Sequence, residues 1–270
     1  MLFARHLEQF LGHLSRGGPM ALVRYGDGER CIIQGAEIST MGTNRHWCWR
    51  PSLGISSSVL TEDLAATLAV DHPGYHVGIS CPCCNEPDYR FYAARLSPER
   101  RRSRVTYANL FSNGNYPRLA EGFVPALRAA GRPVLLVSNW DRDYARAREV
   151  LAGLRVSVVR MSGREYDEPI ANPVGEGFYR GGAVLWYSKH REQVRAQARR
   201  LAREHADAIV LVQLGPIANI IVAEMFDERP GGTFLDMGHA LDLLLYGETS
   251  RSYMVGEAAM CRDMDVDWAL

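Results

Sequence analysis

The sequence predicts an α/β fold, in which a doubly wound, mostly parallel sheet has helices on both faces. Short apolar runs, typical of strands that are buried on both faces, alternate along the chain with amphipathic helical segments. The clearest unit is an apolar strand at 133–138, a helix at 141–154 and an apolar strand at 156–159, which together predict a parallel βαβ crossover. No linker, charge block or repeat divides the 270 residues, so one domain over 1–270 is expected, with a loop-rich insertion around 31–57.

The other elements follow from hydrophobic periodicity and from the residues that bound each run. An opening helix is expected at 2–14, and a helix at 192–205 has one apolar stripe with arginines on its opposite side. A helix at 217–226 follows a Gly-Pro pair that favours a helix start. About seven strands result, because the remaining apolar runs also predict strands: 21–23, 75–80, 105–110, 208–214 and 232–236.

Composition argues against several classes of function. The 31 basic and 31 acidic residues balance, so bulk electrostatic capture of nucleic acid or of a membrane surface is not expected. Lys189 is the only lysine, which reflects genome composition more readily than function, although arginine does suit phosphate recognition. No apolar segment is long enough to span a bilayer and no secretory signal is visible, so we expect a cytoplasmic protein with reduced cysteines.

The first predicted strand runs into an Arg-Tyr-Gly-Asp-Gly-Glu segment, in which two glycines alternate with two carboxylates. Gly26 and Gly28 break regular structure and let the backbone approach a ligand closely. Asp27 and Glu29 are hard oxygen ligands suited to Mg²⁺ or Mn²⁺, and Arg24 is suited to an anionic group. A tight turn with two solvated acids is the alternative.

Two further strand ends also offer polar groups, and in a parallel sheet they would meet the first at the carboxyl edge. Ser138 and Asn139 are suited to binding a base, ribose or phosphate, and equally to capping the next helix. Gly215 and Pro216 begin a helix whose N–H groups favour a phosphate, although a plain strand-to-helix turn has the same sequence.

The end of the last strand and one earlier turn complete the set of candidates. Asp236 and His239 are suited to ligating a metal, to proton transfer or to orienting one another, although a histidine after a strand is more often structural. Asn109 lies in a Tyr-Ala-Asn-Leu-Phe segment whose aromatic and amide groups suit a sugar or a base. Polar loop tips of no special function look the same.

Half of the cysteines form a Cys-Pro-Cys-Cys segment at 81–84. Its C-x-x-C spacing suggests zinc or redox chemistry, and His72 and His76 upstream would complete a four-ligand set. A Pro-Gly pair separates these histidines, however, and the chain has no second C-x-x-C. Packing of small buried thiols, or lining of a substrate site, is therefore favoured over a metal.

Three segments together resemble the GT-D-type glycosyltransferases, a bacterial family first catalogued as a domain of unknown function. The Val-Arg-Tyr-Gly-Asp-Gly-Glu segment at 23–29 is similar to that family's signature. The Leu-Gly-Pro-Ile-Ala segment at 214–218 and the Phe-Leu-Asp-Met-Gly-His segment at 234–239 resemble its late glycine-proline turn and Asp-x-Gly-His motif. The resemblance spans most of the chain and implies a Rossmann-like α/β sheet, distinct from the commoner glycosyltransferase folds.

The resemblance implies transfer of a sugar, of the hexosyltransferase type, from a nucleotide diphosphate sugar to a glycan or glycoprotein acceptor, with a UDP-sugar as the expected donor. The family's D-x-E motif falls on Asp27 and Glu29, which implies that they hold Mn²⁺ or Mg²⁺ and the donor. Such a cation neutralises the negative charge of the leaving diphosphate, and Arg24 and the glycine-proline helix start would help to bind the same group. Asp236 or His239 would activate the acceptor hydroxyl or complete the metal site.

Two other classes of function stay open. A nucleotide-dependent hydrolase or phosphotransferase would use the same carboxylate loop, although the chain has neither a P-loop nor a G-x-G-x-x-G fingerprint. A non-catalytic module would hold zinc in the cysteine cluster and contact a partner through the aromatic loop near Trp47. The sugar, the acceptor, the stereochemistry and the oligomeric state, a homo-oligomer included, do not follow from the sequence.

Overall fold

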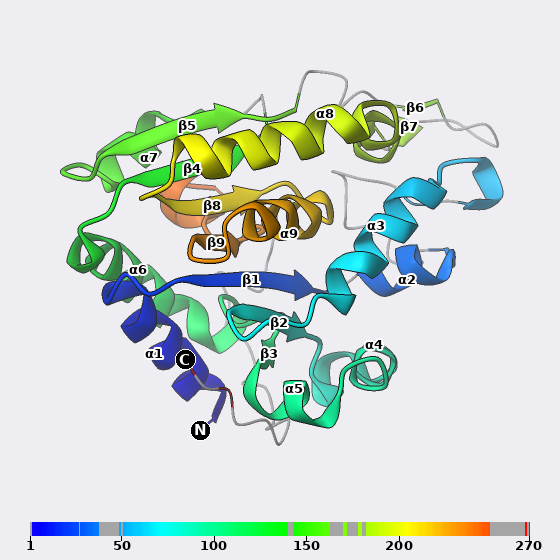
Figure 1. The fold of residues 1–270 in the computed structure, drawn as a ribbon, viewed down its shortest axis with the longest axis horizontal. Coiled ribbons are helices and arrows are strands. Elements are labelled where there is room, and N and C mark those ends of the chain that lie inside the picture. Colours follow the sequence, from blue (N-terminus) through cyan, green and yellow to red (C-terminus); the bar gives the residue numbers. More distant parts are fainter. Residues whose placement is uncertain are drawn as a thin grey trace.

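A seven-stranded sheet runs through the centre of the protein, with the order β3-β2-β1-β9-β8-β4-β5 (Figure 1). The computed structural model describes residues 2–26, 28–37, 49, 51–139, 143–162, 170–171, 178–179, 182–248, 268 and 270. The strands are β1 (Met20–Tyr25), β2 (Tyr75–Ile79), β3 (Val105–Tyr107), β4 (Val134–Ser138), β5 (Val156–Arg160), β8 (Ile209–Gln213) and β9 (Thr233–Asp236). A separate antiparallel pair joins β6 (Ile170–Ala171) to β7 (Phe178–Tyr179).

Every pairing in the seven-stranded sheet is parallel, so the predicted α/β class and sheet type are confirmed. Most of the strands form because their apolar side chains are buried on both faces, and β2, β4 and β8 are buried along their whole length, whereas the edge strand β5 is partly exposed. The first and last strands pair at the centre, with Ala21 opposite Phe234.

The principal helices cover both faces of the sheet. One face holds α3 (Ser58–Ala69), α8 (Gly182–Glu204) and α9 (Ile217–Glu228), which pack on one another. The opposite face holds α1 (Leu2–Ser15), α6 (Tyr116–Ala130) and α7 (Ala145–Val150), the last packed on a short π-helix, η4 (Asp242–Tyr246). Right-handed crossovers explain this division, because the chain moves one way along the sheet through α3, α8 and α9 and the other way through α6 and α7.

Further helical segments are α2 (Glu29–Gln34), α4 (Pro82–Ala93) and α5 (Pro98–Ser103), with 3₁₀ turns η1 (Pro51–Leu53) and η2 (Asn113–Asn115). The described part of the predicted 31–57 insertion therefore contains α2 and η1, while residues 38–48 and 50, Trp47 among them, lie outside the described residues. None of the helices that the structure describes combines the length and the apolar character needed to cross a membrane.

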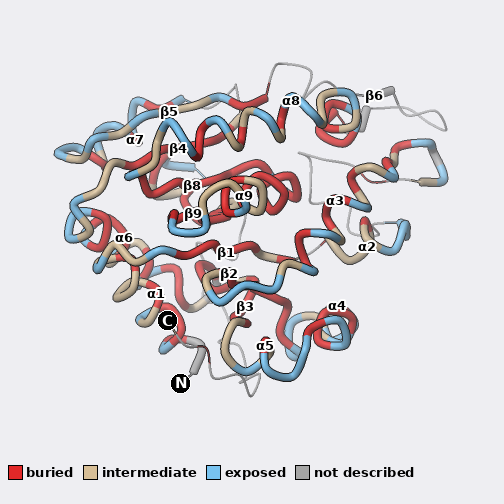
Figure 2. Tube along the Cα trace, in the orientation of Figure 1, coloured by how far each residue is buried: buried red, intermediate tan, exposed pale blue. Residues whose placement is uncertain are grey.

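The buried residues concentrate in the sheet and on the inward sides of the helices (Figure 2). Helix α1 illustrates the pattern, since Leu7, Phe10 and Leu14 lie at helical spacing and are all buried. The ring of Phe10 packs 4.8 Å from that of Phe111, between centroids, which fixes α1 against the chain that follows β3.

Two predicted helix boundaries are wrong. The helix expected at 192–205 begins at Gly182, because a polar run at 188–193 separates the residues that its first turns bury from the apolar stripe. The helix expected at 141–154 extends only from Ala145 to Val150. Asp143, just before the helix, accepts the Ala145 N–H, and Gly153, with φ +86°, lies in the turn that follows the helix.

Candidate functional site

The predicted site segments leave four adjacent strands at one edge of the sheet. The strands β1, β9, β8 and β4 are neighbours in that order, and each ends in one of the polar segments. The carboxyl ends of parallel strands share an edge, so the structure brings these segments together. The chain leaves β4 towards β5 and β8 towards β9, in opposite directions, so a switch point of the kind that binds ligands in such sheets lies between them. Asp27 and Trp140 lie outside the described residues.

Arg24, near the end of β1, ties three strand ends together. Its Nε donates to the Asp236 carbonyl oxygen at 2.8 Å, and its Nη1 donates to the Ala108 carbonyl oxygen at 2.9 Å. Gly78 on β2 makes room for the stem, since a Cβ at that position would lie 3.1 Å from Arg24 Cγ. The Phe111 ring centroid lies 5.3 Å from the guanidinium carbon. The guanidinium is thus engaged with backbone carbonyls, and it supplies positive charge where β1, β9 and β3 end.

Asn219, in the first turn of α9, is a site residue that the sequence reasoning missed. Its Nδ2 donates to the Arg24 carbonyl oxygen at 3.1 Å, and its Oδ1 accepts the Arg24 N–H at 3.2 Å. The side chain is fully buried, so this pair of hydrogen bonds fixes the end of β1 to the start of α9. Gly215, with φ +54°, and Pro216 precede that same turn. The sequence feature that could have pointed to Asn219 is that it is the one amide in the otherwise apolar first turns of α9.

Asp236 ends β9 as a buried carboxylate beside Arg24. Its Oδ1 accepts the Gly238 N–H at 2.9 Å, and its Oδ2 lies 3.7 Å from Arg24 Nε. Gly238 has φ +49°, which favours glycine, and a Cβ there would displace Nη2 of Arg24. Burial raises the pKa of the Asp236 carboxyl above its ordinary value, while the charge of Arg24 opposes the shift. Such a carboxylate is a candidate for proton transfer.

His239 begins a chain of side-chain hydrogen bonds that leads to the end of β8. Its Nδ1 lies 2.7 Å from Asp242 Oδ2, and Asp242 Oδ1 accepts from Gln213 Nε2 at 3.2 Å. Tyr246 donates to Gln213 Oε1 at 2.7 Å. A carboxylate on Nδ1 holds the proton there, which leaves Nε2 as the basic nitrogen of the neutral ring. This is the orientation that a general base requires. The sequence reasoning missed Asp242, although its His-x-x-Asp spacing to His239 was visible, and it missed the two residues beyond Asp242 in the chain of hydrogen bonds.

Glu29 folds back over the glycine loop at the end of β1. Its Oε2 accepts the Gly28 N–H at 3.3 Å and lies 4.0 Å from where a Cβ on Gly26 would be. A carboxylate oxygen beside open backbone at a strand end fits the ligand chemistry of Mg²⁺ or Mn²⁺. Glu29 alone does not complete a site, and no group of three acidic or histidine ligands surrounds it among the described residues.

Buried polar atoms gather where β4 and β5 end. The hydroxyls of Ser138 and Ser162 and the Oδ1 of Asn139 are buried, and none of them has a hydrogen-bond partner within the described parts of the chain. Buried polar groups are nearly always paired, so partners for these three atoms would come from water, from a ligand or from the adjoining residues outside the described ranges.

Asn109 lies apart from that place. It follows β3 at the sheet's edge, and its Nδ2 lies 3.9 Å from the sulfur of Cys84. Five strand spacings separate β3 from β4, which amounts to roughly 24 Å. Asn109 was expected to suit a sugar or a base and Ser138 a base, ribose or phosphate, and at this separation the two residues cannot contact the same base.

Comparisons with known proteins bear on the fold. No protein-family model and no curated protein matches the chain. One solved structure is similar to this chain with a TM-score of 0.50 and 13% identity, over 98% of this chain and 95% of that one. Its description says that the highly conserved domain of unknown function 1792 has a distinct glycosyltransferase fold. A selenomethionine-substituted structure of domain of unknown function 1792 has a TM-score of 0.46 at 13% identity, over 97% and 95% of the two chains. The first likeness confirms the fold that the GT-D resemblance implied.

Proposed function

We propose that this protein is a glycosyltransferase that moves a sugar from a nucleotide diphosphate sugar, expected to be a UDP-sugar, to a glycan or glycoprotein acceptor. One observation supports this above the others. A chain with a glycosyltransferase fold over nearly its whole length gathers a carboxylate loop, a helix start and a carboxylate-oriented histidine at the carboxyl edge of its sheet.

The diphosphate of the donor is assigned to the ends of β1 and β8. The start of α9 offers N–H groups to phosphate oxygens, and the fixed charge of Arg24 lies beside it. Asp27 and Glu29 would hold Mn²⁺ or Mg²⁺, which supplies Lewis-acid neutralisation of the diphosphate when it is bound. In this assignment Arg24 acts by its charge and by positioning the strand ends, since two of its nitrogens already donate to carbonyls.

The acceptor hydroxyl is assigned to the ends of β9 and β8, where His239 is held by Asp242. Nε2 of His239 would take the proton of the acceptor hydroxyl as that oxygen attacks the sugar carbon. Asp236, whose pKa is raised by burial, is the second candidate for the same step. The nucleoside is assigned to the β4 end, where Ser138 and Asn139 provide buried polar atoms.

Thermal stability tests the assignment of the donor site. UDP with Mn²⁺ at about 100 times its Kd should stabilise the protein by about 2.7 kcal/mol, which corresponds to a rise in Tm of roughly 5–10 °C for a chain of this size. Glu29→Gln and Asp27→Asn should abolish the shift. Glu204→Gln, the same exchange at an exposed residue near the end of α8, should retain it. Full shifts in both site variants, or no shift with any nucleotide diphosphate, would contradict the proposal.

Donor turnover separates the proposal from a nucleotide-dependent hydrolase or phosphotransferase. UDP release from a UDP-sugar should be slow without a glycan acceptor and should rise when the correct acceptor is added. His239→Asn should lower the acceptor-dependent rate by about 10²–10⁴-fold, the typical contribution of a general base, while leaving the UDP-induced Tm shift in place. Rapid release that no acceptor changes would favour the hydrolase.

A further inference from the structure

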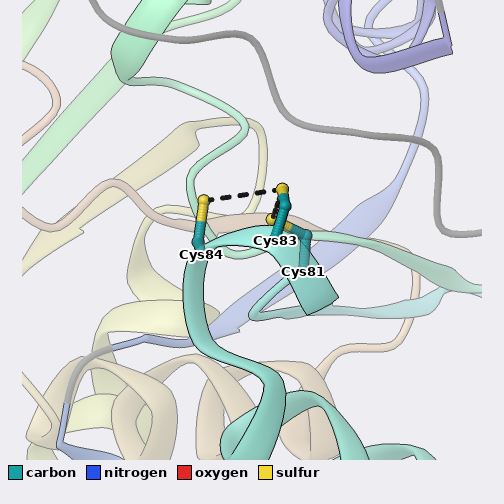
Figure 3. Close-up of side chains that lie close together, drawn as sticks. All are labelled: Cys81, Cys83 and Cys84. Atoms are coloured by element: carbon teal, nitrogen blue, oxygen red, sulfur yellow. Dashed lines mark hydrogen bonds between the residues drawn. The ribbon is translucent and has the colours of Figure 1, made fainter.

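We propose that Cys81, Cys83 and Cys84 bind one Zn²⁺ ion through three thiolates. The three sulfur atoms lie together at the carboxyl end of β2, beside the site described above (Figure 3). The proposal is independent of the glycosyltransferase assignment, because it uses none of the residues assigned to catalysis or to the cation of the donor.

The local backbone brings the three sulfurs together. Cys81 follows β2 in an extended conformation, and Pro82 starts α4 directly after it. The Cys81 carbonyl accepts the N–H of both Cys84 and Asn85, at 3.2 and 3.0 Å, so the turn folds Cys83 and Cys84 back over Cys81. Asn85 then departs from helical geometry and separates this turn from the rest of α4.

The distances between the sulfurs suit a thiolate site. Sγ of Cys83 lies 2.9 Å from that of Cys81 and 3.9 Å from that of Cys84, and all three lie within 4.8 Å of one another. Tetrahedral Zn²⁺ with Zn–S bonds of about 2.3 Å separates its sulfurs by about 3.8 Å. The observed distances bracket that value, so small side-chain rotations would complete the geometry.

Packing accounts for only one of the three residues. Cys81 is fully buried, but Cys83 and Cys84 are exposed. A free cysteine is normally buried as a small apolar side chain, so two adjacent solvent-facing thiols next to a buried one need another explanation. Of the two roles that the sequence favoured, packing therefore applies to Cys81 and not to its two neighbours, for which lining of a substrate site is the alternative to a metal.

The upstream histidines do not belong to this cluster. His76 is the second residue of β2 and accepts the Nε1–H of Trp268, and five residues of strand place it roughly 16 Å from Cys81. His72 precedes β2 and accepts the Gly74 N–H through Nδ1. Among the residues described, the cluster thus offers three protein ligands, and solvent would occupy the fourth position of the ion.

An ion in this place would connect two segments that border the site. The amide of Asn109, in the turn after β3, lies 3.9 Å from the Cys84 sulfur and would act as an outer-shell donor to the thiolate. Farther along α4, the buried Asp88 pairs with Arg30 of α2, the helix that begins at Glu29. Occupancy would therefore stabilise the start of α4 and the turn beside Arg24. Binding releases the thiol protons to solvent as Zn²⁺ takes their place.

Metal titration of the reduced, metal-free protein tests the proposal. Zn²⁺ in competition with a chromophoric chelator should bind at one ion per chain, and Co²⁺ should give thiolate-to-metal charge-transfer absorption. Cys83→Ser and Cys84→Ser should each weaken Zn²⁺ binding by more than about 100-fold, above the upper end of what losing an outer-shell partner costs. These residues are exposed, so circular dichroism of the metal-free variants should match that of the parent protein.

Cys31→Ser is the matched control, because Cys31 is a free, half-buried cysteine of α2 outside the cluster and burial raises the pKa of its thiol. This variant should bind Zn²⁺ as the parent protein does. Unchanged binding in Cys83→Ser and Cys84→Ser, an equal loss in Cys31→Ser, or binding of Cu(I) without Zn²⁺ would overturn the assignment. A zinc site that persists in a protein that ignores UDP would refute the proposed function alone.

Discussion

Replacing His76 by asparagine should make the stability of the protein less sensitive to acid. His76 is buried in β2, and its Nδ1 accepts the Trp268 Nε1–H at 2.9 Å, so the folded protein holds the ring neutral. Burial is the main cause that lowers its pKa to about 3, and the positive charges of His13, Arg104 and Arg100 act in the same direction. Asparagine keeps an acceptor oxygen but does not titrate.

The sign and size of the effect follow from proton linkage. An unfolded histidine has a pKa near 6.5, so between pH 6.5 and about 3 the unfolded state binds more protons than the folded state. The stability contributed by neutral His76 is complete above pH 6.5 and falls with pH by up to about 1.36 kcal/mol per pH unit. At pH 5 the unfolding free energy is therefore lower by about 2 kcal/mol, a large fraction of the typical unfolding free energy of about 5–15 kcal/mol.

Urea unfolding at pH 7, 6 and 5 measures this contribution. The parent protein should lose about 2 kcal/mol more than His76→Asn between pH 7 and pH 5, because other titrating groups are common to both proteins and cancel. His76→Gln, which likewise keeps an acceptor oxygen and does not titrate, should show the same reduced dependence on pH. If the difference in unfolding free energy between parent and His76→Asn stays constant with pH, the linkage argument is wrong.

Three further substitutions test individual contacts within the fold. Asn219→Ala should lower the unfolding free energy by about 1–3 kcal/mol in urea titrations, since it leaves both peptide groups of Arg24 without these partners. Gly238→Ala should reduce stability in the same assay and also lower donor-dependent Tm shifts, because its Cβ would displace the Arg24 guanidinium; an unchanged Tm and shift would show that the turn adapts. Asp63→Asn should lower the unfolding free energy by about 2 kcal/mol in thermal unfolding, because it breaks the bidentate ion pair with Arg191. The Arg191 side chain is 33% exposed, so this pair is weaker than a fully buried one.

The sheet was predictable because its strands have the simplest pattern in the chain. Continuous apolar runs such as 134–138 and 209–213 fit few structures other than a strand buried on both faces. Helices α3 and α6 were not predicted at all. Pro125 lies inside α6, where a proline usually ends or bends a helix, yet the apolar side chains of α6 still pack on α1. Tertiary contacts decide such helices, and a single sequence does not contain them.

The candidate site was predictable only at its strand ends. Glycines and acids after an apolar run mark such a place by residue type, which is why Gly26, Glu29 and Asp236 were selected. Asn219 and Gln213 sit inside apolar segments, and their importance comes from the backbone groups that they meet in three dimensions. The distance between Asn109 and Ser138 likewise depends on strand order, which the sequence did not specify.

The pairing of the first strand with the last has a consequence for biosynthesis. Arg24 and Asp236 meet although 212 residues separate them in the chain, so β1 gains its neighbour β9 only after the whole intervening segment has been translated. At about 5–20 residues per second, that interval lasts on the order of 10–40 s. During it the nascent polypeptide exposes an apolar strand with an open edge, the kind of segment that chaperones shield from aggregation. Ribosome-bound fragments that stop before β9 should therefore be far more sensitive to protease than the released chain.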